Sequence, residues 1–206
     1  MRICILPLRA LSFDERTVRA LPFGKAEQTR LLAIGNKKRA LCSLGALLAL
    51  QSLTDHAHSI LRTPEGKPYF DDPDAPAFSL SHSDTLAVAV LADDDAGSVG
   101  IDVEDIRPCP QATRIAKRFF TAAECAHLAE FPTDEAFLTL WTAKEAVAKM
   151  SGQALASALS APTTSGYTQS VRLIGDGIDA LLCLAAERPI TTVEWLCPPT
   201  LQIFER

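Results

Sequence analysis

Apolar positions recur at helical spacing in two parts of the chain. Leucines three and four positions apart predict a helix around residues 41–48. A second helix is predicted over residues 134–150, where Ser151 and Gly152 end the pattern. Each helix should bury its apolar stripe against a core and leave its polar face in solvent.

Runs of β-forming residues predict strands between and after these helices. The turn-forming residues 93–97 and 175–177 each lie between two such runs, so two hairpins are predicted. The glycines of the second turn also match a dinucleotide-binding spacing, but too little chain follows to complete that unit, and the hairpin is preferred. Short, mixed elements of this kind indicate an α+β fold. The predicted strands are residues 3–8, 78–92, 98–103, 171–174 and 178–184.

Composition places the chain among ordinary folded proteins. Its 206 residues suffice for one domain or two small ones, and a content of 48% hydrophobic and 22% charged residues excludes disorder. The longest uncharged stretch, residues 40–54, is too short to cross a bilayer, and residues 3–8 are too few for a signal peptide. We therefore expect no membrane span.

The cysteine pattern indicates the cellular compartment, and the net charge limits the kinds of ligand. Six scattered cysteines without metal-ligand spacing predict a reduced, cytoplasmic protein. A net charge of −5 repels nucleic acid and other polyanions, so an anionic ligand would need a local basic pocket.

Two acidic residues share one face of a predicted strand. Asp102 and Glu104 alternate with Ile101 and Val103, and the side-chain period of a strand places both carboxylates on one side. Neighbouring negative charges repel each other unless a cation neutralises them, and a hard divalent metal is the simplest partner. The alternative is an edge strand whose acids face solvent, because so short a pattern recurs by chance.

A third carboxylate lies on the apolar stripe of the second helix. Glu145 follows Leu138 and Trp141 at helical spacing, so it should face the core. Lys149 comes one turn later. The functional interpretation is a metal ligand beside a phosphate-binding lysine, and the alternative is a surface pair that contributes about 0.3–0.5 kcal/mol.

Three further features are ambiguous on their own. Thr121 and Glu124 match a capping box, which would give Glu124 a structural role. His82 could be a satisfied buried histidine or a donor to a phosphate. Residues 107–118 carry four cations and no acid, and most such runs are solvated helix faces.

Five motifs in this order resemble the 4′-phosphopantetheinyl transferase superfamily, surfactin-synthetase-activating type. The most specific are G-I-D-x-E at residues 100–104 and W-T-x-K-E-x-x-x-K at residues 141–149. One residue departs from the pattern, because Ser79 stands where the family usually has Asn. The motifs are Gly66-Lys67-Pro68, Phe78-Ser79-Leu80-Ser81-His82-Ser83, Gly100-Ile101-Asp102-Val103-Glu104, Phe120-Thr121-Ala122-Ala123-Glu124 and Trp141-Thr142-Ala143-Lys144-Glu145-Ala146-Val147-Ala148-Lys149.

The resemblance implies a monomer of two similar α+β halves, residues 1–98 and 99–206, related by a pseudo-two-fold axis with coenzyme A between them. It implies Mg²⁺-dependent transfer of 4′-phosphopantetheine from coenzyme A to a serine of an acyl or peptidyl carrier protein, with release of 3′,5′-ADP. The implied metal ligands are Asp102, Glu104 and Glu145. The implied coenzyme contacts are Arg39, Arg62, Lys67, Ser81, His82, Lys144 and Lys149.

The catalytic candidates are Glu124, Glu145 and Lys149, with one of the two glutamates taking the proton of the carrier serine. The cations of residues 107–118 could dock an acidic carrier helix by charge complementarity.

Two alternatives to the transferase stay open. One is a metal-dependent nuclease that uses Asp102, Glu145 and a lysine, although the acidic net charge counts against it. The other is a coenzyme A or carrier-binding module without turnover.

Overall fold

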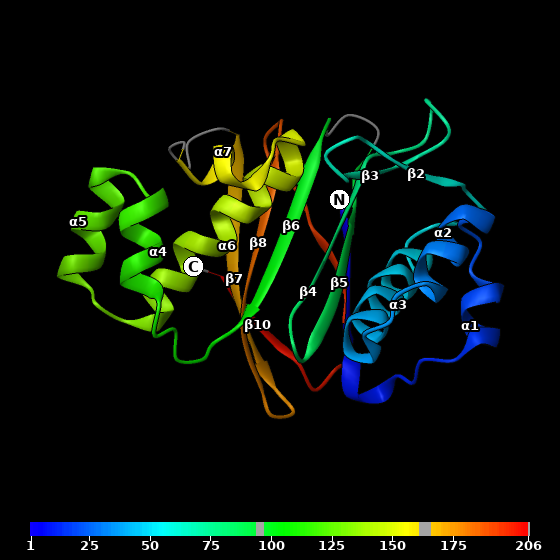
Figure 1. The fold of residues 1–206 in the computed structure, drawn as a ribbon, viewed down its shortest axis with the longest axis horizontal. Coiled ribbons are helices and arrows are strands. Elements are labelled where there is room, and N and C mark those ends of the chain that lie inside the picture. The colour runs from blue at the N-terminus through cyan, green and yellow to red at the C-terminus, as the bar shows by residue number, and fades with distance from the viewer. Residues whose placement is uncertain (94–96, 161–165, 206) are drawn as a thin grey trace.

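Two four-stranded sheets stand face to face in the computed structural model, with helices on the outer side of each (Figure 1). The structure describes residues 1–93, 97–160 and 166–205, and it confirms the predicted α+β class. The elements are β1 (Arg2–Pro7), η1 (Leu8–Ala10), α1 (Glu15–Ala20), α2 (Gly24–Leu32), α3 (Lys37–Gln51), β2 (Ile60–Arg62), β3 (Pro68–Phe70), β4 (Phe78–His82), β5 (Leu86–Leu91), β6 (Val99–Asp105), α4 (Ala112–Phe119), α5 (Ala122–Glu130), α6 (Asp134–Ser151), α7 (Leu155–Ser160), β7 (Tyr167–Gly175), β8 (Ile178–Ala186), β9 (Glu194–Leu196) and β10 (Gln202–Glu205).

Three strands of each sheet repeat one topology, while the fourth strands, β9 and β10, join different edges. The first has the strand order β4-β5-β1-β9 and the second β10-β7-β8-β6. In the segment β1-α3-β4-β5 the last strand pairs antiparallel with the other two, and the segment β6-α6-β7-β8 pairs in the same way. This repeat is what two similar halves require, while the pseudo-two-fold axis and the boundary after residue 98 stay predictions.

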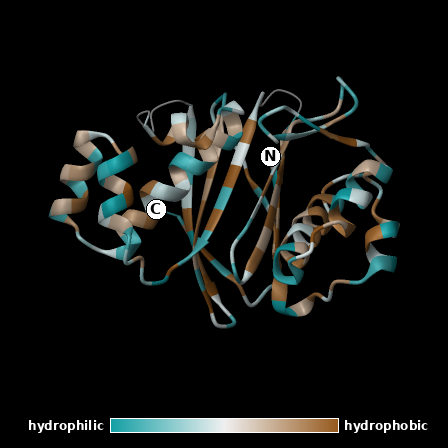
Figure 2. Ribbon diagram, viewed as in Figure 1, coloured by the Kyte–Doolittle hydropathy of each residue, from teal (hydrophilic) through white to brown (hydrophobic). Residues whose placement is uncertain are grey.

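Apolar side chains fill three layers, which alternation within the strands makes possible. Ile3 and Ile5 of β1 meet Ile101 and Val103 of β6 in the core between the sheets. A second cluster lies between the first sheet and α3, and a third lies between the second sheet and α6. Figure 2 shows brown, apolar residues along the strands and on the helices beside them. Each square ångström of apolar surface removed from water contributes about 25 cal/mol, so these layers hold both sheets in place.

Several predicted elements are confirmed. The leucine spacing gives α3, and the second predicted helix gives α6, which ends where Gly152 adopts a left-handed φ of 70°. The hairpin around residues 175–177 is the pair β7 and β8. Among the described residues, none of the helices combines the length and the apolar character needed to cross a bilayer.

The hairpin predicted between residues 78–92 and 98–103 is wrong. Residues 78–92 form a hairpin by themselves, β4 and β5, whose turn is closed by the bond from the Ser83 nitrogen to the Leu86 carbonyl oxygen. Strand β6 joins the other sheet, where Asp102 lies opposite Cys183 of β8. Residues 94–96 of the acidic turn expected there lie outside the described residues.

Candidate active site

Strand β6 and helix α6 touch at the backbone because residue 100 is glycine. A Cβ at Gly100 would lie 2.0 Å from the carbonyl oxygen of Ala146 and 2.5 Å from the nitrogen of Met150. Only a residue without a side chain permits this approach. The contact brings Asp102 of β6 beneath the helix residues Glu145 and Lys149.

Asp102 is the centre of a buried polar cluster. Its side chain is 3% exposed, and its Oδ1 lies 2.6 Å from Lys149 Nζ. The hydroxyl of Ser81, from β4 of the other sheet, donates to the same oxygen at 2.7 Å. Glu145 Oε2 lies 3.9 Å from Lys149 Nζ. The acids of β6 therefore face α6 rather than solvent, and Glu145 faces them, as the two sequence patterns predict.

The cluster contains more negative charge than Lys149 neutralises. Burial, and next to it the charge of Asp102, raises the pKa of Glu104 to about 7. The same two causes, in the same order, raise the pKa of Glu145 to about 7. Two carboxyl groups this close share a proton or a cation. Asp102 Oδ2 is buried and accepts no hydrogen bond from the described residues.

The donor set fits Mg²⁺ in chemistry and charge. No group of three or more His, Cys, Asp or Glu side chains in the described parts of the chain is arranged to hold a metal ion as it stands. However, carboxylate oxygens are the ligands that Mg²⁺ prefers, and the buried Oδ2 of Asp102 lacks a donor. Asp102, Glu104 and Glu145 are therefore the residues that would hold the ion.

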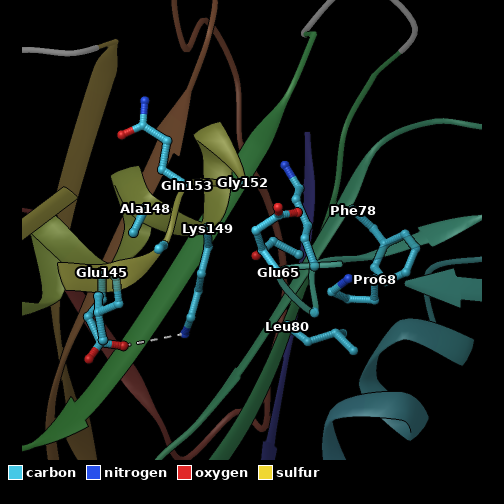
Figure 3. Close-up of a pocket in the computed structure, with 14 residues that line it drawn as sticks. Glu65, Pro68, Phe78, Leu80, Glu145, Ala148, Lys149, Gly152 and Gln153 are labelled. Carbon is cyan, nitrogen blue, oxygen red and sulfur yellow. Dashed lines mark ion pairs between the residues drawn. The ribbon is translucent and has the colours of Figure 1, made fainter. Parts of the chain in front are cut away.

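A cavity of about 280 Å³ opens beside the acids, between the two halves (Figure 3). One wall is α6 with Glu145 and Lys149, followed by residues 152–155. The other wall comes from the first half, from residues 65–68 and residues 78–80. Figure 3 shows Lys149 extending between these walls, with its ion pair to Glu145 dashed.

Lys67 joins the two walls. Its Nζ donates to the carbonyl oxygen of Met150 at 2.6 Å, near the end of α6 where helix carbonyls lack helical partners. Burial lowers the pKa of Lys67. A basic side chain from the first half thus lies at the cavity together with Lys149 from the second.

Comparisons with known proteins place the chain in a family. A family profile described as the 4′-phosphopantetheinyl transferase superfamily matches residues 98–192, which carry β6 and α6. The 4′-phosphopantetheinyl transferase AcpT of Escherichia coli (strain K12) is 32% identical over 162 residues, 72% of this chain and 80% of AcpT. This chain belongs to the 4′-phosphopantetheinyl transferase superfamily.

Other superfamily members match over a smaller share of their length. The 4′-phosphopantetheinyl transferase psf-1 of Bacillus pumilus is 35% identical over 141 residues, 67% of this chain and 55% of psf-1. The 4′-phosphopantetheinyl transferase HetI of Nostoc sp. is 36% identical over 97 residues, 44% of this chain and 40% of HetI. The chain thus spans about half the length of these two superfamily members.

Of the residues expected from the resemblance, only Lys67, Glu145 and Lys149 are among the described residues that line the cavity. Asp102, Glu104 and Ser81 lie in the polar cluster next to it, and the others lie elsewhere. Arg39 is exposed in the first turn of α3, and His82 is exposed at the end of β4. Arg62 is paired with the buried Glu27 at 2.9 Å. Lys144 is buried and does not line the cavity.

Glu124 is also placed away from the cavity. The capping box predicted with Thr121 is present, because the Thr121 hydroxyl accepts from the nitrogen of Glu124 and the Glu124 carboxylate accepts from the nitrogen of Thr121. The same carboxylate lies 2.9 Å from Lys144. Its surroundings are those of an acid in a helix interface.

Two residues with structural roles were not predicted, Asp105 next to the site and Glu27 away from it. Asp105 accepts bonds from the Ser83 hydroxyl, the Asp84 nitrogen and the Thr85 hydroxyl, and so ties the turn after β4 to the end of β6. Its place directly after the G-I-D-x-E motif was the available signal. Glu27 holds Arg30 as well as Arg62, and its three-residue spacing from Arg30 predicts only the first of these pairs.

Proposed function

We propose that this protein transfers 4′-phosphopantetheine from coenzyme A to a serine of an acyl or peptidyl carrier protein. The observation that carries the proposal is that acidic and basic side chains from both halves lie together at one cavity. Glu145 and Lys149 of α6 line the cavity from the second half, where Lys149 also pairs with Asp102 of β6, and Lys67 lines it from the first half. Superfamily membership supports the same chemistry and gives no support to a nuclease.

The pyrophosphate of coenzyme A would lie between Lys67 and Lys149, which supply positive charge from opposite walls of the cavity. His82 and Arg39 would contact phosphates further along the coenzyme, near the end of β4 and the start of α3. Ser81 would hold β4 to Asp102 through its 2.7 Å bond. Arg62, Lys144 and Glu124 are left out of this set because each has a partner away from the cavity.

The carrier serine would attack the phosphorus that bears the pantetheine arm. The new bond joins the serine oxygen to that phosphorus, and the bond to the departing 3′,5′-ADP breaks. Glu145 is placed to take the serine proton, because its carboxyl group lines the cavity in which the coenzyme would lie. A Mg²⁺ ion bound by Asp102, Glu104 and Glu145 would stabilise the phosphate charge.

The carrier would dock on α4. Arg114, Lys117 and Arg118 are exposed on this helix. Lys117 also borders a cavity of about 590 Å³ between α4, α5 and α6, whose lining includes Phe137 and Leu128. A cationic rim beside an apolar hollow suits an acidic amphipathic helix. The monomeric state and a cytoplasmic location, with six cysteines free of disulfides, belong to the same proposal.

The decisive experiment measures the intact mass of apo carrier proteins after incubation with this protein, coenzyme A and Mg²⁺. We expect a gain of one phosphopantetheine that is lost with EDTA and in Glu145→Ala. Coenzyme A binding without any mass gain, tested on carriers of fatty-acid, polyketide and peptide synthesis, would instead identify a binding module.

A further inference from the structure

Lys144 lies in the interior of the second half, with 1% of its side chain exposed. Its Nζ is 2.9 Å from Glu124 Oε2 and donates to the carbonyl oxygen of Leu159 at 2.9 Å. It also stands 5.1 Å from the centre of the Phe120 ring. An ammonium ion gives up its hydration on burial, so it stays charged there only with partners such as these. The partners come from α5, from α7 and from the residue that ends α4.

Glu124 is fixed at the other end of the pair. Its Oε2 accepts the N–H of Thr121 at 2.8 Å, which closes the capping box of α5, and the same atom faces Lys144. Its Oε1 is buried and accepts no hydrogen bond from the described residues. The carboxylate is therefore placed to hold a cation within a helix interface, and it borders none of the cavity beside the acids.

Helix α7 connects this pair to the cavity. Residues 153–155 line the cavity, and Leu155 is the first residue of α7. Leu159, one turn later, is 3% exposed in the core that also contains Phe120. Its carbonyl oxygen accepts the hydrogen bond from Lys144 Nζ. Lys144 thus ties α7 to α6 and fixes the end of the cavity wall.

We propose that Glu124 and Lys144 are a positioning pair that holds the cavity wall at residues 153–155. Neither residue touches coenzyme A or the carrier serine. The proposal rests on the proposed function, because it takes this cavity as the coenzyme site. Loss of the pair should loosen α7 and weaken coenzyme A binding, while Asp102 and Glu145 still support the chemical step.

Lys144→Met tests the pair, with the exposed Lys25→Met as its matched control. Hydrogen exchange of the amides at residues 153–160 should be about tenfold faster or more in Lys144→Met, with α3 unchanged. The KM for coenzyme A should rise about tenfold, while kcat stays within about threefold. Lys25→Met should change neither.

Glu124→Gln separates positioning from chemistry, with Glu130→Gln on the same helix as its exposed control. Glutamine can still complete a capping box, so this variant loses the charge and keeps the cap. Its KM should rise as in Lys144→Met. The double variant should be no worse than Lys144→Met alone, because it no longer buries an unpaired carboxylate. If Lys144→Met does not fold, the double variant takes its place.

Two results would overturn the positioning pair. One is a fall of about a hundredfold in kcat at unchanged KM in Glu124→Gln, which would make Glu124 the base. The other is unchanged exchange at residues 153–160 in both single variants. The exchange measurement needs no turnover, so an inactive wild type would refute the proposed function and leave the result on the pair standing.

Discussion

The two halves share one order of strands and helix, but they differ in the side chain that lies at the centre of the strand beneath the helix, Cys4 in the first half and Asp102 in the second. In the first half, Cys4 of β1 lies on the side that faces α3, within an apolar cluster. In the second half, Asp102 of β6 lies on the side that faces α6, against Glu145 and Lys149. The same arrangement therefore serves as scaffold in one half and as site in the other. The side chains beneath the helix make the difference.

Each half also has a glycine at a close contact between a helix and its neighbours, and the atoms around the two glycines differ. A Cβ at Gly45 of α3 would lie 2.8 Å from Leu8 Cδ2, the end of a flexible side chain, and 2.8 Å from Ala87 Cβ, which moves only with β5. A Cβ at Gly100 would meet the backbone of α6, which cannot move without the residues it carries. Close packing is thus a matter of core volume in the first half and of site geometry in the second.

Gly100→Ala should break the second half. The added methyl lies 2.0 Å from a backbone oxygen, so α6 must move away and take Glu145 and Lys149 with it. We expect a loss of about 3 kcal/mol or more in the free energy of unfolding, measured with urea, and no detectable transfer. Gly35→Ala is the control, because nothing lies within 4 Å of its Cβ position. Equal stability of the two variants would mean that α6 does not rest on Gly100.

Asp102→Asn and Cys4→Ala test whether the residue beneath the helix supports activity in the second half and only stability in the first. Asp102→Asn keeps the shape of the side chain and removes its charge, so transfer should fall about a hundredfold or more while the unfolding free energy changes little. Cys4→Ala should cost about 1 kcal/mol in stability and leave the transfer rate unchanged. Intact-mass rates and urea midpoints check both. A loss of rate in Cys4→Ala comparable to that in Asp102→Asn would contradict the division of roles.

The two halves should also respond differently to pH in the absence of metal. Burial and the charge of Asp102 raise the pKa of Glu104 and of Glu145 from 4.5 to about 7. Between these values the folded state binds more protons than the unfolded state, so stability should fall as pH rises through this window. We expect a decrease of at most about 3 kcal/mol for each of the two carboxyl groups, followed by a plateau. Urea unfolding in EDTA measures it, and Glu104→Gln with Glu145→Gln should flatten the slope.

The pKa of Glu27 in the first half is shifted in the opposite direction. Burial opposes its charge, yet hydrogen bonds from Arg30 and Arg62 lower its pKa below 4.5. Its contribution to stability is therefore present above that pH and is lost as the pH falls further. In Glu27→Gln the acid limb of the stability curve should become shallower, while the slope near neutral pH should persist. If the slope near neutral pH disappeared in Glu27→Gln, that slope would come from the first half and not from Glu104 and Glu145.

Charge reversal on α4 tests whether the second half also binds the carrier protein. Arg114→Glu with Lys117→Glu should raise the carrier KM about tenfold at low salt and less at high salt, because the interaction is between exposed charges. The KM for coenzyme A should not change. Lys25→Glu on α2 is an exposed control of the same charge type. An unchanged carrier KM at every salt concentration would exclude docking on this helix.

Local periodicity predicts what depends on neighbouring residues. Helical spacing gives α3 and α6, the strand period places Asp102 and Glu104 on one face, and the Gly-rich turn gives the hairpin β7 and β8. The partner of β6 is different, because β8 lies about eighty positions later in the chain and pairing at that distance leaves no period. Adjacency in sequence favoured the wrong hairpin for that reason.

Partners brought together by tertiary packing are equally invisible in the sequence. Lys144 belongs to a specific motif and has the chemistry of a phosphate contact, but its partner Glu124 is supplied by another helix. Arg62 likewise finds Glu27, which lies 35 positions earlier. A sequence shows that a cation is present, and only the packing shows which acid already holds it.

A hydrogen bond between β4 and β6, which come from different halves, gives a small expected effect. Strand β6 is an edge strand, and the backbone N–H of Ile101 donates to the hydroxyl of Ser79 on β4 at 3.2 Å. Ser79→Ala should leave this buried donor without a partner and cost about 1–2 kcal/mol in urea unfolding. Ser79→Asn should recover part of that loss, because an amide oxygen can accept the same bond. Equal losses in both variants would show that volume at residue 79 matters more than the bond, and the contact between these two strands would then depend on packing alone.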